Sequence, residues 1–153
     1  MDIHIELARL DDVPTLISLL TDLFSIEQDF RPEPDKQERG LQALLAREDS
    51  ARIHVIRSSQ GAVIGMVSAQ LVISTAEGAA SVWIEDLVLD QAWRGQGLGR
   101  RLLASILDWA WEKGTTRAQL LADMGNTPAL AFYDHLGWQP TQLRAYRMSG
   151  RLP

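Results

Sequence analysis

The feature that most restricts the fold of this chain is a glycine-rich loop between an apolar strand pattern and a long helical pattern. The six residues from Arg94 to Gly99 read RGQGLG, and an apolar stretch from Ser81 to Leu89 precedes them. Apolar residues then recur at helical spacing from Gly97 to Lys113, and another strand pattern covers Arg117 to Ala122. These segments predict a strand–helix–strand unit with a right-handed crossover. The loop then lies at the C-terminal end of a strand, where open α/β sheets bind ligands.

The remaining patterns extend this unit in the order β-α-α-β-β-β-α-β-α-β, which predicts a mixed sheet with helices on its faces. No linker divides the chain, so its 153 residues are expected to form one domain over residues 1–153. The additional expected elements are strands at residues 3–7, 53–56, Ala62 to Ile73 and Leu143 to Met148, and helices at residues 11–24, Asp35 to Arg47 and Thr127 to Leu136.

Composition narrows the functions that this chain can have. The net charge of -5 disfavours a broad electrostatic grip on nucleic acid, and suits a cationic substrate or simply solubility. The chain has no Cys, which excludes disulfides, thiolate metal sites and a Cys nucleophile. No metal site is expected, because His4, His54 and His135 are far apart in sequence. No apolar run is long enough to span a bilayer, and cytoplasmic residence is expected.

The glycine loop predicts an anion-binding site. Glycines without Cβ atoms let the backbone wrap an anion, and the start of the next helix supplies unpaired N–H groups and a positive dipole end. The alternative is that the glycines only permit a tight turn, for which one glycine would suffice. The dinucleotide fingerprint fails because Arg100 and Leu102 stand where its last glycine is required. The P-loop fails because Arg100 and Arg101 follow the last glycine.

The loop resembles the acetyl-CoA-binding motif Arg/Gln-x-x-Gly-x-Gly/Ala of the GNAT superfamily of N-acetyltransferases, with Arg94, Gly97 and Gly99 in the fixed places. The strand before it resembles the family's fourth strand, and Asn126 to Trp138 resembles its coenzyme-contacting helix and the strand after it. The resemblance implies an α/β (α+β) fold with a mixed, mostly antiparallel sheet of six to seven strands flanked by about four helices. It also implies acetyl-CoA as co-substrate, with the expected contacts at Leu87, Val88, Leu89, Arg94, Gly95, Gln96, Gly97, Leu98, Gly99, Arg100, Asn126 and Tyr133.

Two residues are predicted to be catalytic. Glu85 is the candidate base, because simple alternation places it on the apolar face of Trp83, Leu87 and Leu89, where burial raises the pKa of a carboxylate. Asp86 is its rival, because a β-bulge would change which side chain faces the cleft. Tyr133 is the candidate acid for the departing thiolate, since it occupies the family's usual Tyr position. The alternative is that Tyr133 only packs in the core, as a Tyr in a helical apolar stripe more often does.

The other predicted roles concern binding. In the family that this chain resembles, backbone N–H groups at the end of the fourth strand stabilise the oxyanion. The resemblance therefore implies this role for the N–H groups of residues 87–89. Asn126 is expected either to contact the pantetheine arm or to begin the helix. The connection after the first helix carries Glu27, Asp29 and Phe30, which could hold an ammonium group or form a solvated loop.

The predicted function is transfer of an acetyl group from acetyl-CoA to a primary amine of a small molecule or peptide, by direct attack in a ternary complex. The absence of Cys fits this route. The alternative is a non-catalytic acyl-CoA-binding or regulatory module of the same fold. Trp109 and Trp111 lie two apart on the long helix and cannot share one face, so one of them is expected at a contact, such as a homodimer, or in the core.

Overall fold

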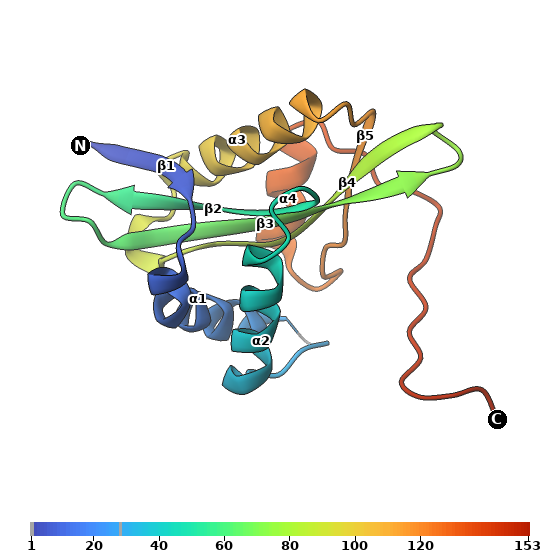
Figure 1. Ribbon diagram of the computed structural model, residues 1–153, viewed down its shortest axis with the longest axis horizontal. Helices are drawn as coiled ribbons and strands as arrows, with labels where there is room; N and C mark the ends of the chain where they lie inside the picture. The colour runs from blue at the N-terminus through green and yellow to red at the C-terminus, as the bar shows by residue number, and fades with distance from the viewer. Residues whose placement is uncertain (1, 28) are drawn as a thin grey trace.

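The computed structural model describes residues 2–27 and 29–153, and its elements follow the predicted order almost to the end (Figure 1). Five strands form one sheet in the order β1-β2-β3-β4-β5. Neighbouring strands pair antiparallel except β4 and β5, which are parallel. The strands are β1 (Ile3–Leu7), β2 (Ala51–Ser58), β3 (Val63–Ser74), β4 (Ala79–Leu89) and β5 (Arg117–Leu120). The helices are α1 (Val13–Ile26), α2 (Pro34–Leu45), α3 (Leu98–Glu112) and α4 (Thr127–His135).

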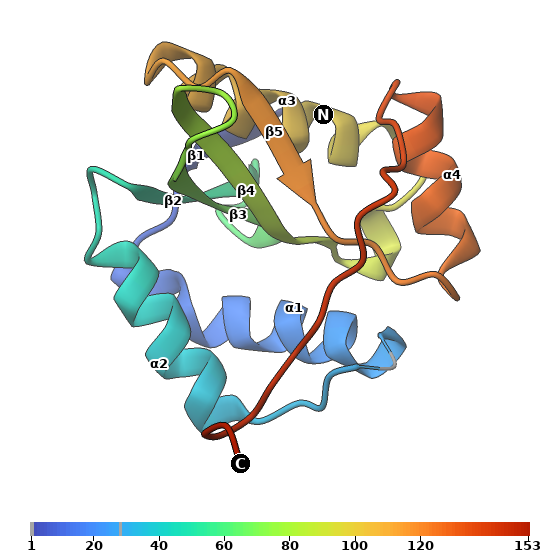
Figure 2. The ribbon, with the colours of Figure 1, turned by 90° about the vertical axis from the view of Figure 1, so that its right-hand side faces the viewer.

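The helices cover the sheet in two layers (Figure 2). On one face lie α3 and α4, over a core that includes Val67, Ile84 and Ile106. On the other face lie α1 and α2, over a second core that includes Leu16 and Met66. Alternate residues of β3 therefore belong to opposite layers, as the two-residue repeat of a strand requires. Trp109 is 5% exposed in the first core, whereas Trp111 is 45% exposed.

A β-bulge interrupts β4 in its second half. Glu85 pairs with Ser68 of β3, and Val88 pairs with Met66, so two residues of β4 oppose the single residue Val67. Asp86 has a φ of 55°, a left-handed conformation that Asp adopts more readily than most residues. The bulge reverses which residues of β4 face which helical layer.

The sheet is smaller than predicted. The expected count of six to seven strands is wrong for the described residues, which form five. The predicted strand from Leu143 to Met148 is instead extended chain without a strand partner, and Leu143 is 79% and Tyr146 90% exposed. Its apolar residues therefore gain no burial to offset the entropy of ordering a strand. The predicted strand from Arg117 to Ala122 is shorter and ends at Leu120.

The parallel strands β4 and β5 separate near the middle of the sheet. They pair only between Ser81 and Ile84 on β4 and Arg117 and Leu120 on β5. From Glu85 to Leu89, β4 has no neighbour on that side in the described chain. Figure 2 shows the chain after β5 turning away towards α4. An open strand edge therefore runs from the bulge to the glycine loop.

Candidate functional site

The glycine loop presents backbone donors to solvent. Gly95 and Gly97 both have a φ of 76°, a left-handed conformation that favours glycine, and Gly97 is the N-cap of α3. A Cβ atom at either position would meet nothing within 4 Å, so the space in front of this backbone is open. Within residues 2–27 and 29–153, the N–H groups of Gly95, Gln96 and Gly97 donate to no acceptor. With the unpaired amides of the first turn of α3, they form a cradle suited to a diphosphate.

Arginines reinforce this cradle. Arg94 is exposed, and its Nε donates to the carbonyl oxygen of Leu89 at 3.1 Å, which links the loop to the end of β4. Arg100 is exposed on the first turn of α3. A Cβ atom added at Gly99 would come into van der Waals contact with the side chains of Phe132 and Leu89, so the start of α3 lies beside α4 and the end of β4. The predicted coenzyme residues from Leu87 to Arg100 are thus contiguous in space, and the open edge of β4 leads into them.

The bulge places two consecutive carboxyl groups on the same face of the sheet. Leu87 and Leu89 pack in the α3 layer, whereas Glu85 and Asp86 both line a cavity on the α1 and α2 side. The prediction that Glu85 shares a face with Leu87 and Leu89 is therefore wrong, because the extra residue in β4 breaks the alternation. Glu85 is exposed, and its Oε1 accepts a hydrogen bond from Trp83 Nε1 at 2.8 Å.

Asp86 has the desolvating environment that strand alternation predicted for Glu85. Burial, and then repulsion by Glu85, raise the pKa of Asp86 to about 6, although a hydrogen bond from Ser68 acts in the opposite direction. The Oδ2 atom of Asp86 lies 3.2 Å from the Ser68 hydroxyl. A carboxyl group with a pKa near the working pH can both accept and release a proton. Its role as base, like that of Glu85, stays a prediction.

Glu27 and Tyr133 complete this side of the site. Burial, followed by repulsion from Asp86 and other acids, raises the pKa of Glu27 to about 7. Burial and then the charge of Glu27 raise the pKa of Tyr133 to about 12, which keeps its phenol protonated. Tyr133 packs edge to face against Phe132 and Trp138, with ring centroids 5.2 and 5.9 Å apart. The end of α1, the bulge and α4 therefore converge.

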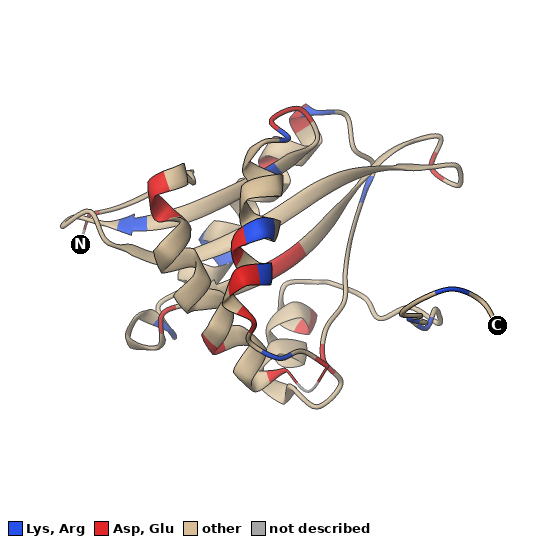
Figure 3. Ribbon diagram, turned by 60° about the horizontal axis from the view of Figure 1, so that its bottom comes forward, with Lys and Arg blue, Asp and Glu red and all other residues tan. Residues whose placement is uncertain are grey.

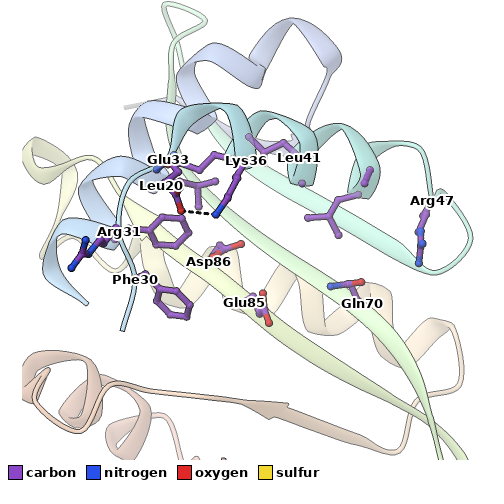
Figure 4. Close-up of a pocket in the computed structure, with 15 residues that line it drawn as sticks. Leu20, Phe30, Arg31, Glu33, Lys36, Leu41, Arg47, Gln70, Glu85 and Asp86 are labelled. Carbon is purple, nitrogen blue, oxygen red and sulfur yellow. Dashed lines mark hydrogen bonds and ion pairs between the residues drawn. The ribbon is translucent and has the colours of Figure 1, made fainter. Parts of the chain in front are cut away.

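The cavity beside the carboxyl groups has a volume of about 500 Å³ and lies between α2, the α1–α2 connection and the middle of the sheet. In Figure 4, Glu85 and Asp86 lie on its β4 side, and Leu41 and Lys36 lie on its α2 side. The predicted residue Phe30 lines it, and its ring packs against that of Phe24 in a tilted arrangement, with centroids 5.4 Å apart. Its volume is in the range of small-molecule sites.

The C-terminal chain reaches the same connection. The guanidinium group of Arg147 lies over the ring of Phe30 at 5.3 Å, and its Nη1 atom is 3.9 Å from Oδ2 of Asp29. Asp29 and Phe30 therefore already contact a cationic side chain of this protein. Acidic and basic positions are otherwise interspersed along the ribbon, without one continuous basic stripe in the described chain (Figure 3).

Asn126 has a structural role at the start of α4. Its side-chain oxygen accepts a hydrogen bond from the N–H group of Ala129 at 3.3 Å, so it caps the helix. Contact with a pantetheine arm stays a prediction. Ser68 could not be recognised from the sequence, because only the pairing of β3 with the bulge reveals its position. Glu27 was expected only to bind substrate, and no local sequence pattern places it near Tyr133.

Comparisons with known proteins fit this geometry. The profile of the Acetyltransferase (GNAT) family matches residues 16–138. The N-alpha-acetyltransferase RimI of Mycobacterium tuberculosis is 39% identical over 69 residues, which cover 44% of this chain and 42% of that protein. The alignment therefore spans less than half of the curated relative.

Solved structures agree over nearly the whole chain. A possible acetyltransferase from Clostridium difficile 630 has a TM-score of 0.84 at 21% identity, covering 98% of this chain and 99% of that one. The aminoglycoside N-acetyltransferase AAC(6')-Iy in complex with CoA has a TM-score of 0.81 at 16% identity, covering 97% and 95%. At these identities the structures show the fold, and the profile match shows that the chain belongs to the GNAT family of acetyltransferases.

Proposed function

We propose that this protein transfers the acetyl group of acetyl-CoA to a primary amine of a small molecule or peptide, by direct attack in a ternary complex. The observation that carries the proposal is the open edge of β4 between the bulge and the glycine loop. The cradle of unpaired backbone amides lies at one end of this edge, and the carboxyl groups of Glu85 and Asp86 lie on the cavity at its other end. A pantetheine arm lying along this edge would connect the two. A protein with the same fold forms a complex with CoA, which supports the choice of coenzyme.

Each group near the bulge has a role suited to its environment. Most of an alkylamine is protonated at neutral pH, so attack requires a base. Asp86 is the proposed base because it lines the cavity and burial raises its pKa, and Glu85 and Glu27 interact with it electrostatically. Tyr133 keeps its proton and can donate it to the leaving thiolate. Backbone N–H groups at Leu87 to Leu89 would stabilise the oxyanion.

Substrate class follows from the acceptor side of the cavity. Glu27, Glu85 and Asp86 concentrate negative charge there, and Asp29 and Phe30 lie at its margin. Such a site favours a cationic amine over a neutral one. The similarity to an N-alpha-acetyltransferase and to an aminoglycoside acetyltransferase makes peptide N-termini and amino sugars the first acceptors to test.

The test is release of CoA thiol from acetyl-CoA across a panel of amines. A thiol reagent can follow the reaction directly, because the protein has no Cys to react with it. We expect thiol release that depends on the acceptor, together with acetylated amine detected by mass spectrometry. Binding of CoA without release for any amine would instead establish the non-catalytic binding module. Absence of CoA binding would reject both.

Of the described residues, none belongs to a helix that is both apolar and long enough to traverse a lipid bilayer.

A further inference from the structure

The hydroxyl group of Ser68 lies between two oxygen atoms of the bulge. Ser68 is 2% exposed, and its Oγ atom is 3.1 Å from the carbonyl oxygen of Glu85 and 3.2 Å from Oδ2 of Asp86. A hydroxyl group has one proton to donate and can accept at the same time. It therefore donates to only one of these oxygens at any moment.

The protonation of Asp86 decides which oxygen that is. When Asp86 is ionised, donation to its carboxylate is the stronger bond, because one partner is charged. When Asp86 is protonated, its own O–H can donate to Ser68 Oγ, and the hydroxyl proton turns to the carbonyl oxygen of Glu85. In both states the carboxyl group of Asp86 therefore keeps Ser68 as a hydrogen-bond partner, which avoids the cost of an unsatisfied buried group.

We propose that Ser68 is a positioning residue that fixes Asp86 on the cavity and keeps both protonation forms of its carboxyl group hydrogen-bonded during acetyl transfer. This inference rests on the proposed function, in which Asp86 accepts the proton of the amine. In that step an N–H bond of the ammonium group breaks and an O–H bond forms on Asp86. The proton of Ser68 is not transferred; it changes only its acceptor.

The backbone around Ser68 supports this assignment. Ser68 is the register partner of Glu85, immediately before the place where β4 gains its extra residue. Asp86 has a positive φ, which is uncommon for a residue other than glycine and is maintained by surrounding contacts. One hydroxyl group bonded to two successive residues of the bulge is such a contact. Ser68 thereby links the conformation of the strand to the position of the carboxyl group.

Other charged groups surround Asp86 without hydrogen-bonding it. Glu85 lies beside it on β4, and Glu27 at the end of α1 interacts with it electrostatically. The charged residues that line the same cavity from α2 and its flanking segments are Arg31, Glu33, Lys36 and Arg47. Glu33 and Lys36 are paired with each other at 2.9 Å. In the described chain, Ser68 is the one side chain that hydrogen-bonds Asp86.

The test is a titration of the Asp86 side-chain carboxyl group, followed by carbon-13 NMR in the free protein. The Ser68→Ala variant should titrate at a higher pH than the wild type by roughly one pH unit, because the ionised form loses a stronger bond than the neutral form. Ser81→Ala is the matched control. Ser81 is also 2% exposed, and its hydroxyl donates to the backbone carbonyl oxygen of Arg117 at 3.1 Å, at the other end of β4.

An unchanged or lowered titration pH in Ser68→Ala, or an equal rise in Ser81→Ala, would overturn the proposal. If Ser68→Ala does not fold, Ser68→Cys provides the same test. Its thiol is a weaker donor of similar shape and should give a smaller shift in the same direction.

Kinetics provide a second readout that separates the two proposals. With an acceptor found in the amine panel, the acidic limb of the kcat/KM profile of Ser68→Ala should move to higher pH, while the plateau at high pH stays within a few fold. A limb that does not move would contradict the role of Ser68. A wild-type protein that acetylates no amine would reject the proposed function, and the NMR titration would still decide whether Ser68 controls Asp86.

Discussion

The two sides of the candidate site consist of different chemical groups: backbone amides on one side and side chains on the other. On the coenzyme side, the proposed functional groups are backbone amides of the glycine loop and of the open edge of β4. On the acceptor side, they are side chains that come from the end of α1, the bulge and α4. The first side depends on local conformation within one stretch of chain. The second depends on three segments that meet only in the folded protein.

This difference determines how strongly a single substitution can alter each side of the site. Backbone donors bind a diphosphate whatever the neighbouring side chains are, so the cradle needs only glycines and a helix start. Carboxyl groups acquire their pKa values from neighbours, so the acceptor side can change with a single substitution. We therefore expect the largest effects of mutation on catalysis at the acceptor side, and moderate effects on CoA affinity at the loop.

Tyr133→Phe should have the largest effect. Loss of a positioned acid lowers the rate by about 10²–10⁴-fold. The ring contacts with Phe132 and Trp138 stay, so the thermal stability should hardly change. Thiol release under saturating substrates measures kcat. The only other tyrosine, Tyr146, is 90% exposed, and Tyr146→Phe should leave the rate unchanged. An equal rate for Tyr133→Phe would show that another group protonates the thiolate.

Asp86→Asn should lower kcat/KM by about 10²-fold, the lower end of the range for a general base. The smaller effect is expected because Glu27 is close and has its own raised pKa of about 7. Glu85→Gln is the matched comparison, since Glu85 is exposed on the same cavity. We expect it to lose less activity than Asp86→Asn. The reverse order would return the role of base to Glu85 and break the argument from burial.

The glycine loop and the helix after it could be predicted from the sequence because their signal is contiguous. Arg94, Gly97 and Gly99 stand at fixed spacing beside a strong helix pattern, and the structure has α3 beginning directly after its N-cap Gly97, while the binding role of these residues stays a prediction. The profile match confirms the family. The element order was also predictable up to α4, because each helix and strand carries its own apolar period.

The acceptor side could not be predicted in the same way. Alternation assigns Glu85 and Asp86 to opposite faces, and one inserted residue places both on the same face. The sequence could only name the bulge as an alternative. The C-terminal segment fails for another reason. Its apolar residues suggest a strand, but a strand forms only where a partner edge is available, and residues 143–148 have none in the described chain.

Gly97→Ala tests the coenzyme side. At a φ of 76°, a side chain costs about 1–2 kcal/mol of strain, which the free loop can relieve by changing conformation. CoA binding must then restore the strained conformation of the loop, and this cost should weaken CoA binding by about 5–30-fold. Isothermal calorimetry would measure this loss. Gly78→Ala has a similar φ of 65° and equally open space, but lies in the turn between β3 and β4. It should change stability without changing CoA affinity, and equal losses of affinity would contradict the cradle.

The pH dependence of stability should distinguish two carboxyl groups. The folded-state pKa of Asp86 is raised from 3.8 to about 6, so the folded protein binds more protons than the unfolded chain between these pH values. Its free energy of unfolding therefore falls as the pH rises through this window. Asp86→Asn should make the protein more stable than the wild type at pH 8, as measured by urea unfolding.

Asp12 should behave in the opposite way. Burial opposes its ionisation, but hydrogen bonds from Arg57 and from the Arg9 amide outweigh this and lower its pKa. Its stabilising contribution is present above the unfolded-state pKa and is lost as the pH falls. Asp12→Asn should therefore destabilise the protein at pH 8. If Asp86→Asn instead destabilises the protein at pH 8, as Asp12→Asn does, the ionised form of Asp86 is not disfavoured in the folded state.

Arg147→Ala should have the smallest effect on stability. The guanidinium group contacts Phe30 and Asp29, but its side chain is 60% exposed and that of Asp29 is 75% exposed, so solvent screens both interactions. We expect the free energy of unfolding to fall by less than about 1 kcal/mol. Arg144, which makes no such contact in the described chain, provides the control Arg144→Ala.

The informative quantity for Arg147→Ala is KM for a cationic acceptor. If Phe30 and Asp29 hold the acceptor, removal of the competing guanidinium lowers KM, because the ring and the carboxylate become available. If they do not, KM stays the same in both variants, and the acceptor must be held by the carboxyl groups at the bulge alone.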